Sequence, residues 1–253
     1  MPHLTHLSSR LEALPLTRPY TIAYRSVSAV EIVLVELHSD NGLIGRGAAN
    51  PSPKVVGESS VQTQATLSGE SVQWLMGQDL RTLPRLTREL AQRHATQPGV
   101  MAALDIALHD LYAQHLGLPL ARVLGQVHRA LPTSITIGIK DVQETVAEAE
   151  EYLAAGFSHL KVKLGHDLDT DLARLYRLRE RFGDAIHLRV DANQGYDRAG
   201  VLALHAAQAR LKLELIEQPV PVADTDTLCD LPAELRYPFP QPHLAPIRWG
   251  PDL

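Results

Sequence analysis

The feature that most constrains the fold is a regular alternation of strand and helix patterns after Gly125. Short apolar runs alternate with amphipathic stretches, and Asp141 stands where a helix N-cap is needed while Gly156 and Gly183 stand where helices end. The strand candidates are 133–139, 159–164, 187–191 and 213–217, and the helix candidates are 142–155, 169–182 and 198–211. Strands joined by helices form a parallel sheet with right-handed crossovers. We therefore predict a βα-repeat domain from residue 126 onward.

The first 125 residues have a different pattern. Residues 1–50 have the pattern of antiparallel strands, in which an apolar, β-branched run over 29–37 is followed by the turn residues Ser39-Asp40-Asn41-Gly42 and a returning strand over 43–48. Helical spacing then predicts three helices, at 62–76, 84–94 and 99–115. We expect an α+β domain over 1–125.

Four charged residues recur at similar places in the βα units. Lys161 and Lys163 lie two apart on one strand, so their side chains project from the same face. Asp191 follows Lys163 by 28 residues, and Glu217 follows Asp191 by 26. One βα unit of a barrel takes about 31 residues, so these groups are expected at the C-terminal ends of successive strands, where such barrels carry their active sites.

Carboxylates that converge from separate strands suit a hard cation such as Mg²⁺. A lysine beside such a cation is expected to have a lowered pKa, because nearby positive charge disfavours its ammonium form, and it can then act as a base. The spacing alone leaves open a second interpretation, a salt-bridged ring of exposed charges at the strand ends.

Composition excludes several classes of partner. The chain has 24 Lys and Arg against 29 Asp and Glu, and this net charge of −5, without a long basic run, argues against nucleic acid. No stretch approaches the roughly 20 apolar residues that span a bilayer. With one cysteine, Cys229, and no secretory signal in residues 1–10, a cytoplasmic protein is expected. The histidines, His159 and His187 among them, have no ligand spacing and are interpreted as surface or helix-packing residues.

Several motifs occur in a fixed order. They are Lys161-Val162-Lys163, Asp191-Ala192-Asn193-Gln194-Gly195, Glu217-Gln218-Pro219 and an upstream helix over 102–110 that is followed by 116–120. Together they resemble the enolase superfamily, in its muconate-lactonizing branch, over residues 14–238. This resemblance implies an N-terminal capping domain of enolase type over 1–125, followed by a (β/α) barrel of TIM type.

Within that branch the chain most resembles the dipeptide epimerases of the L-Ala-D/L-Glu kind. Residues 16–20 with Arg25 resemble the first capping loop, whose arginine reaches an acidic substrate side chain. Residues 48–53 with Gly57-Glu58 resemble the second capping loop. Residues 133–138 resemble the first barrel strand, with Thr136 at its substrate-contacting threonine.

The resemblance also implies a role for each charged residue. Lys163 would be the acid/base at the substrate α-carbon, and Lys161 would support charge at the substrate carboxylate. Asp191 and Glu217 would be the first two Mg²⁺ ligands, with Asn193 beside them. The implied reaction is removal of an α-proton next to a metal-bound carboxylate, followed by reprotonation from the other side.

The length predicts only part of a barrel. After residue 125 the chain has 128 residues, enough for about four βα units of eight. A third metal carboxylate is expected near 242, but Phe239-Pro240-Gln241-Pro242-His243 stands there. We therefore expect a half-barrel over 126–238 and an irregular tail over 239–253. A truncated or frame-shifted gene product, in register to Pro238, is the hypothesis that follows.

These expectations give a dipeptide epimerase by resemblance, acting on a dipeptide such as L-Ala-L-Glu, with activity impaired by the missing half-barrel. An exposed edge on the fourth strand favours association, including a homo-oligomer. Two alternatives stay open. One is another enzyme of the branch, such as an N-acylamino acid racemase or a cycloisomerase, and the other is a non-catalytic fragment.

Overall fold

The computed structural model describes residues 2–22, 25–224 and 226–229. Contacts divide the chain into two compact units, one of Met1–Arg18 with Ser28–Ala130 and the other of Pro19–Val27 with Leu131–Leu253. The predicted tail over 239–253 and the expected carboxylate near 242 lie outside the described residues. The domain boundary at 125 stays a prediction. None of the described helices is long and apolar enough to cross a membrane.

The first unit contains the predicted hairpin. Its sheet has the order β1-β2-β3, formed by Leu4–Ile22, Arg25–Ser39 and Ile44–Ala49. Strands β2 and β3 are antiparallel and run from the pair Val33–Ala49 to the pair His38–Ile44. The turn between them needs Gly42, whose φ of 83° is in the left-handed region. The hairpin prediction is thereby confirmed.

The helices of this unit follow the sheet in the chain. They are α1 Pro53–Val56, α2 Ser60–Leu67, α3 Leu83–Arg93, α4 Pro98–Leu116 and α5 Leu120–Val123, with 3₁₀ helices η1 Glu70–Leu75 and η2 Leu80–Thr82. The single helix predicted over 62–76 is wrong, because Gly69 has an extended backbone and separates α2 from η1.

Helix α4 packs closely against β3. A Cβ atom added to Gly45 or Gly47 would collide with the backbone carbonyls of Ala107 or Ala103 on α4, so only glycine allows this approach. Leu104, Leu108 and other side chains of α4 are fully buried in the core of the first unit.

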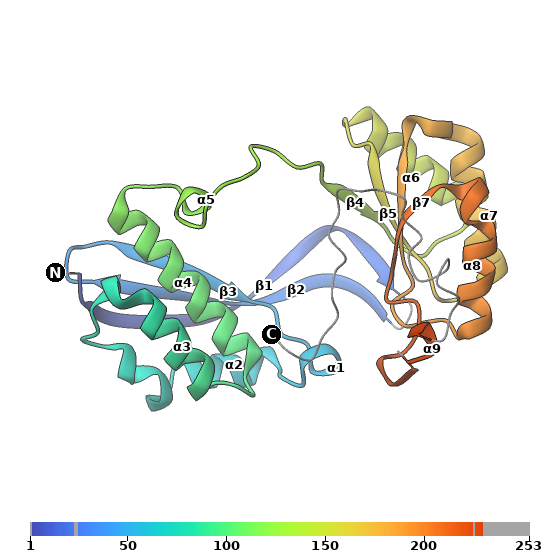
Figure 1. Ribbon diagram of the computed structural model, residues 1–253. Coiled ribbons are helices and arrows are strands. Elements are labelled where there is room, and N and C mark those ends of the chain that lie inside the picture. The colour runs from blue at the N-terminus through green and yellow to red at the C-terminus, as the bar shows by residue number, and fades with distance from the viewer. Residues whose placement is uncertain (1, 23–24, 225, 230–253) are drawn as a thin grey trace. The chain divides into compact units, whose positions relative to one another are not determined.

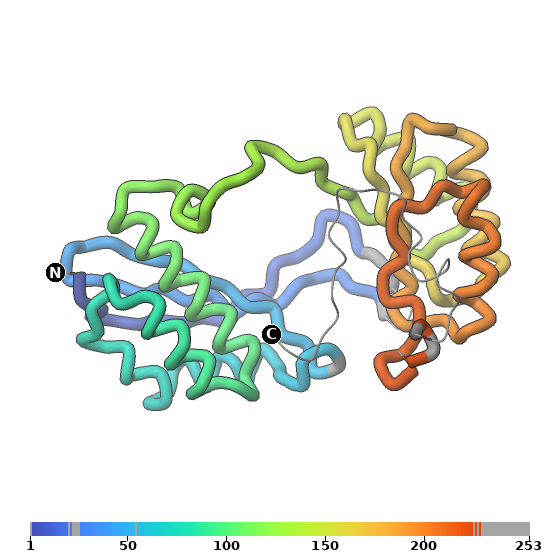
Figure 2. Tube along the Cα trace, in the orientation of Figure 1, coloured from blue at the N-terminus to red at the C-terminus, as the bar shows by residue number. Residues whose placement is uncertain are grey.

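The second unit is built from parallel strands that alternate with helices. The elements are β4 Ser134–Ile137, α6 Val142–Ala154, β5 His159–Lys163, α7 Leu168–Phe182, η3 Gly183–Ala185, β6 His187–Asp191, α8 Arg198–Leu211, β7 Leu213–Glu217, η4 Val222–Asp224 and α9 Asp226–Cys229. The sheet order β4-β5-β6-β7 follows the chain, and each neighbouring pair is parallel. Figure 1 shows α7 and α8 side by side, and Figure 2 follows the same alternation along the chain. The partial barrel of four strand units is confirmed.

The two faces of this sheet differ in polarity. Leu160, Val162, Leu188 and Val190 are fully buried in the core of the second unit, together with apolar residues of the helices. Side chains on alternate positions project from the opposite face, which therefore carries the lysines of β5 and the acidic end of β6. The side chains of Asp141, Asp167 and Asp197 cap α6, α7 and α8.

Candidate active site

The strand register brings the predicted charged residues to one end of the sheet. Lys163 pairs with Asp191, and Asp191 pairs with Glu217, so the last residues of β5, β6 and β7 are neighbours. Lys161 lies two residues earlier on β5, opposite Thr136 of β4, whose side chain is exposed. Because the strands are parallel, the same ends meet at one edge, where βα proteins build their sites.

The four charged groups form one network. Lys161 Nζ lies 2.7 Å from Glu217 Oε2 and 3.0 Å from Asp191 Oδ2. Lys163 Nζ lies 2.6 Å from the same Asp191 oxygen. The Asp191 side chain is only 2% exposed, whereas that of Glu217 is 35% exposed. The ammonium group of Lys161 thus lies between the two carboxylates.

This arrangement favours the charged forms of Asp191 and Lys161. Burial by itself raises the pKa of Asp191, but the hydrogen bonds from Lys163 and Lys161 outweigh it and the pKa is lowered. Burial by itself lowers the pKa of Lys161, but its hydrogen bonds to Glu217 and Asp191 outweigh it and the pKa is raised. The lowered lysine pKa expected beside a bound cation stays a prediction about the metal-bound state.

The oxygen atoms at this edge fit a hard divalent cation. Asp191 and Glu217 both direct an oxygen to one positive atom, Lys161 Nζ, so their carboxylates converge. The backbone N–H of Asn193 donates to Asp191 Oδ1 at 2.9 Å. The side-chain oxygen Oδ1 of Asn193 is buried without a hydrogen-bond partner among the described residues. Two converging carboxylates and an unpaired amide oxygen are ligands that Mg²⁺ accepts.

The loops after the strands have an unusual backbone. Asn193 and Gln194 after β6, and Gln218 after β7, have φ values of 47°, 66° and 41°. Non-glycine residues rarely adopt this region, and such residues cluster at functional sites. The loop after β6 also touches the loop after β5, since a Cβ on Gly195 would collide with the backbone of Gly165.

A buried polar cluster supports the end of β5. Arg174 of α7 is fully buried and donates to the carbonyl oxygens of Gly138 (2.7 Å) and Lys163 (2.8 Å). Asp171 accepts from Arg174 at 3.1 Å, from the hydroxyl of Tyr196 at 2.6 Å and from the N–H of Gly165 at 2.8 Å. Burial and the neighbouring Asp171 raise the pKa of Tyr196, so its hydroxyl stays a donor.

Sequence reasoning missed this cluster. Its one sequence signal is an Asp and an Arg three residues apart on the helix face that packs against the strands. The cluster fixes the backbone that carries Lys163 and the loop that follows it.

The segments compared with capping loops are described only in part. Residues 16–20 lie within β1 and Arg25 is the first residue of β2, so the first of these segments is extended strand where it is described. In the second, Glu58 is buried and accepts from Thr63 Oγ1 at 2.6 Å and from the N–H of Gly99 at 2.7 Å. Glu58 therefore caps the start of α4.

Comparisons with known proteins agree with this arrangement. Residues 7–125 match the family described as "Mandelate racemase / muconate lactonizing enzyme, N-terminal domain". Residues 144–239 match the family described as "Enolase C-terminal domain-like". The two models thus follow one another along the chain.

Named relatives cover most of this chain. It is 51% identical to an L-Lys-D/L-Arg epimerase of Methylococcus capsulatus over 92% of its length, and 36% identical to an L-Ala-D/L-Glu epimerase of Bacillus subtilis over 82%. The chain spans 65% and 58% of these relatives. A crystal structure of a dipeptide epimerase from M. capsulatus, complexed with Mg and the dipeptide L-Arg-D-Lys, has a TM-score of 0.90, with 50% identity over 92% of this chain and 66% of the other.

Proposed function

This chain belongs to the enolase superfamily, in its mandelate racemase and muconate lactonizing branch, and from that membership we propose that it exchanges the α-proton of a dipeptide. The observation that carries the proposal is the register of β5, β6 and β7, in which Lys163, Asp191 and Glu217 are neighbours. A base next to converging carboxylates is the combination that proton removal beside a carboxylate group requires.

The reaction divides among the residues at this edge. Asp191 and Glu217, with Asn193 beside them, would hold Mg²⁺, and a bound cation supplies stabilisation of negative charge on the substrate carboxylate. Lys163 in its neutral form takes the α-proton at Nζ and can return it. Lys161 adds positive charge beside the substrate carboxylate. Arg174 holds the end of β5, so that Lys163 keeps its position.

Two dipeptide classes are candidates for the substrate. The resemblance of Arg25 to a capping-loop arginine favours an acidic second residue, as in L-Ala-L-Glu. The relative with 51% identity is named for Lys and Arg, whereas the relative named for Ala and Glu has 36% identity. We therefore propose a basic dipeptide such as L-Lys-L-Arg as the preferred substrate.

The test is exchange of the α-proton of the second residue for deuterium. It is measured in D₂O with Mg²⁺ present, as the loss of the α-proton signal in ¹H NMR spectra. L-Lys-L-Arg, L-Ala-L-Glu and an N-acylated arginine are compared. Exchange of the α-proton needs only one base. It therefore tests the role of Lys163 even if the chain does not complete an epimerisation. We expect exchange to be fastest with L-Lys-L-Arg and to be abolished by Lys163→Ala.

The matched control is Lys212→Ala, which removes an exposed lysine just before β7 that pairs with Asp184. This variant should exchange at the wild-type rate. Exchange that persists in Lys163→Ala would exclude Lys163 as the base. A wild-type chain that is folded and binds Mg²⁺ but exchanges none of the three substrates would overturn the proposal.

A further inference from the structure

The first residues of β5 and β6 form a second polar layer, at the opposite ends of these strands from Lys163 and Asp191. His159 and His187 pair in the parallel ladder. Their imidazole rings stack with centroids 4.2 Å apart and planes 12° apart. At about 3.3 Å of rise per residue, roughly 13 Å of strand separates this layer from the strand ends that carry Lys163 and Asp191.

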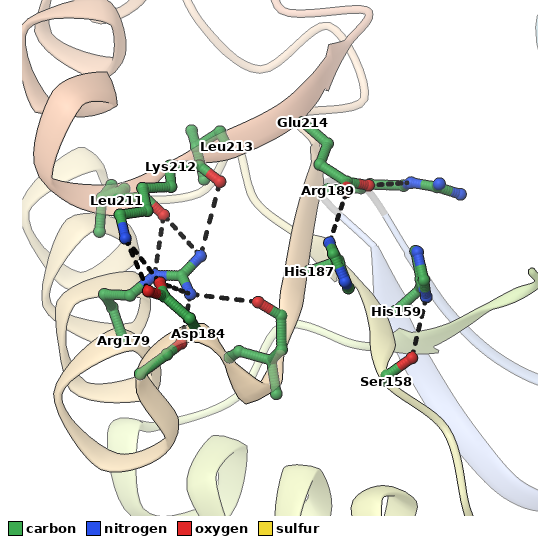
Figure 3. Close-up of polar contacts among 12 residues, drawn as sticks. Ser158, His159, Arg179, Asp184, His187, Arg189, Leu211, Lys212, Leu213 and Glu214 are labelled. Carbon is green, nitrogen blue, oxygen red and sulfur yellow. Dashed lines mark hydrogen bonds and ion pairs between the residues drawn. The ribbon is translucent and has the colours of Figure 1, made fainter. Parts of the chain in front are cut away.

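An irregularity in the ladder brings a carboxylate to the two histidines. Leu188 pairs with Leu213, whereas Arg189 pairs with Leu215, so Glu214 has no partner in the register of β6 and β7. An extra residue of this kind changes the direction of a side chain. Glu214 Oε1 lies 2.7 Å from His187 Nδ1, and Glu214 Oε2 lies 3.0 Å from Arg189 Nε (Figure 3).

We propose that His159, His187 and Glu214 form a binding site for a borderline divalent cation such as Zn²⁺. One nitrogen or oxygen atom of each residue lies within 4.8 Å of the other two. Two imidazole nitrogens and one carboxylate oxygen are a known ligand set for Zn²⁺, with water as the fourth ligand. Bonds of about 2.1 Å separate tetrahedral ligands by about 3.4 Å, and each bond to an imidazole lies in the plane of its ring, so the two stacked rings must turn to direct one nitrogen each at a shared ion.

Neighbouring residues already orient the ligands. Ser158 Oγ lies 3.1 Å from His159 Nδ1, which leaves Nε2 of this ring for the ion. Arg189 donates to Oε2 of Glu214, whereas Oε1 faces Nδ1 of His187, so a bound ion would replace the hydrogen bond between these two atoms (Figure 3). Partners of this kind fix the orientation of metal ligands and tune their affinity. The His187 side chain is 49% exposed, so an ion can enter from solvent.

The two ends of the strands therefore differ in chemistry. The end with Asp191 and Glu217 offers oxygen atoms and suits Mg²⁺, whereas the histidine end suits Zn²⁺, Co²⁺ or Ni²⁺. His187 is exposed, as expected of a surface residue, but the register also brings His159 and His187 into contact, which was not predicted from the sequence. The sequence signal was their equal spacing, each four residues before Lys163 or Asp191.

The experiment is a titration of the full chain, without an affinity tag, with Co²⁺. Binding is monitored by the visible absorption of tetrahedral Co²⁺, and Zn²⁺ is then added to displace the Co²⁺. We expect one ion per chain. His159→Gln, His187→Gln and Glu214→Gln should each weaken binding more than a hundredfold, beyond the roughly 10–100-fold that an outer partner contributes. Ser158→Ala should lie within that smaller range.

Two controls separate this site from others. His205→Gln removes a histidine of α8, and Asp191→Asn with Glu217→Gln removes the carboxylates of the other end. Both should leave Co²⁺ affinity unchanged. Zn²⁺ should also raise the melting temperature of the wild type but not that of His187→Gln. For this comparison the two proteins must have the same melting temperature in the absence of metal.

Three results would overturn the proposal. They are a wild-type chain that does not bind Co²⁺ or Zn²⁺, a wild-type affinity in both histidine variants, and an equal loss in His205→Gln, which marks adventitious binding. If His187→Gln is unfolded without metal, His159→Gln and Ser158→Ala decide the outcome.

Discussion

At the scale of single residues, Lys161 lies between the two carboxylates that are proposed as Mg²⁺ ligands. Its ammonium group contacts Asp191 Oδ2 and Glu217 Oε2, which belong to the two carboxylates proposed to hold Mg²⁺. Charges about 4 Å apart interact by several kcal/mol at an effective dielectric constant near 20. Lys161 therefore offsets the charge of both carboxylates, and we expect it to compete with Mg²⁺ for them.

Replacing this lysine should strengthen Mg²⁺ binding. We expect Lys161→Met to lower the Kd for Mg²⁺ by about tenfold or more, the change that roughly 1.4 kcal/mol produces, and to lower the melting temperature of the metal-free chain. Calorimetric titration and thermal unfolding with and without Mg²⁺ measure both effects. Lys212→Met is the control for loss of one positive charge. Weaker Mg²⁺ binding in Lys161→Met would show that the lysine supports the ion and does not compete with it.

Tyr196 is the second residue whose contribution can be measured. Its hydroxyl donates to Asp171 at 2.6 Å inside the buried cluster below Lys163. A hydrogen bond to a buried carboxylate contributes about 1.5–3 kcal/mol, so Tyr196→Phe should lower the free energy of unfolding by that amount. Urea denaturation measures this loss.

The matched control for Tyr196 is Tyr176→Phe, because the Tyr176 ring packs under Arg210 and its hydroxyl makes no hydrogen bond among those described. This control should change the free energy of unfolding by less than about 0.5 kcal/mol. An equal loss in both variants would mean that the ring environment, and not the hydrogen bond, determines the result.

At the scale of elements, the N-terminus of α7 should make stability depend on pH. Asp167 accepts from Thr170, and this contact lowers the pKa of its carboxyl from 3.8. A carboxyl whose pKa is lower in the folded state stabilises the fold above its unfolded pKa, and this stabilisation is lost as pH falls through the folded pKa. Asn also caps helices, so Asp167→Asn keeps an acceptor and removes the charge.

The melting temperature of Asp167→Asn should therefore be lower than that of the wild type at pH 7, and the difference should disappear toward pH 3. Thermal unfolding at several pH values measures it. Asp169→Asn removes the same charge from the same helical turn, at an exposed position without a described hydrogen bond, and should show a smaller pH dependence. A difference that stays constant with pH would contradict the assignment.

The same elements show how much the sequence could predict. The bounds of β6, β7 and α8 were predicted to the residue, because apolar strand runs and amphipathic helical spacing are local signals. The shared edge of Lys163, Asp191 and Glu217 was also predictable, because parallel strands end at one side. The roles of these residues stay predictions.

Features that depend on tertiary neighbours could not be predicted. The cluster of Asp171, Arg174 and Tyr196 joins a helix to a distant loop, and the position of Glu214 depends on a register irregularity. The break between α2 and η1 was missed because one glycine inside a helical pattern is tolerated in many helices.

At the scale of the whole molecule, the described chain has two large hydrophobic cores that share no residue. One lies between Leu4 and Leu111, and the other lies between Ile137 and Leu213. The chain passes from one unit to the other after Arg18, after Val27 and after Ala130. Each unit therefore buries its own apolar surface, which is the main source of stability in a domain.

Two separate cores predict two unfolding transitions. Leu104→Ala should lower the stability of the first unit alone, and Leu188→Ala that of the second, each by about 2–5 kcal/mol, because both leucines are fully buried. Scanning calorimetry should show two transitions, of which each variant shifts one. Val61→Ala, at an exposed position of α2, should shift neither. A single transition moved equally by both leucine variants would mean that the two cores unfold as one cooperative structure, which the assignment of the segment Pro19–Val27 to the second unit would explain.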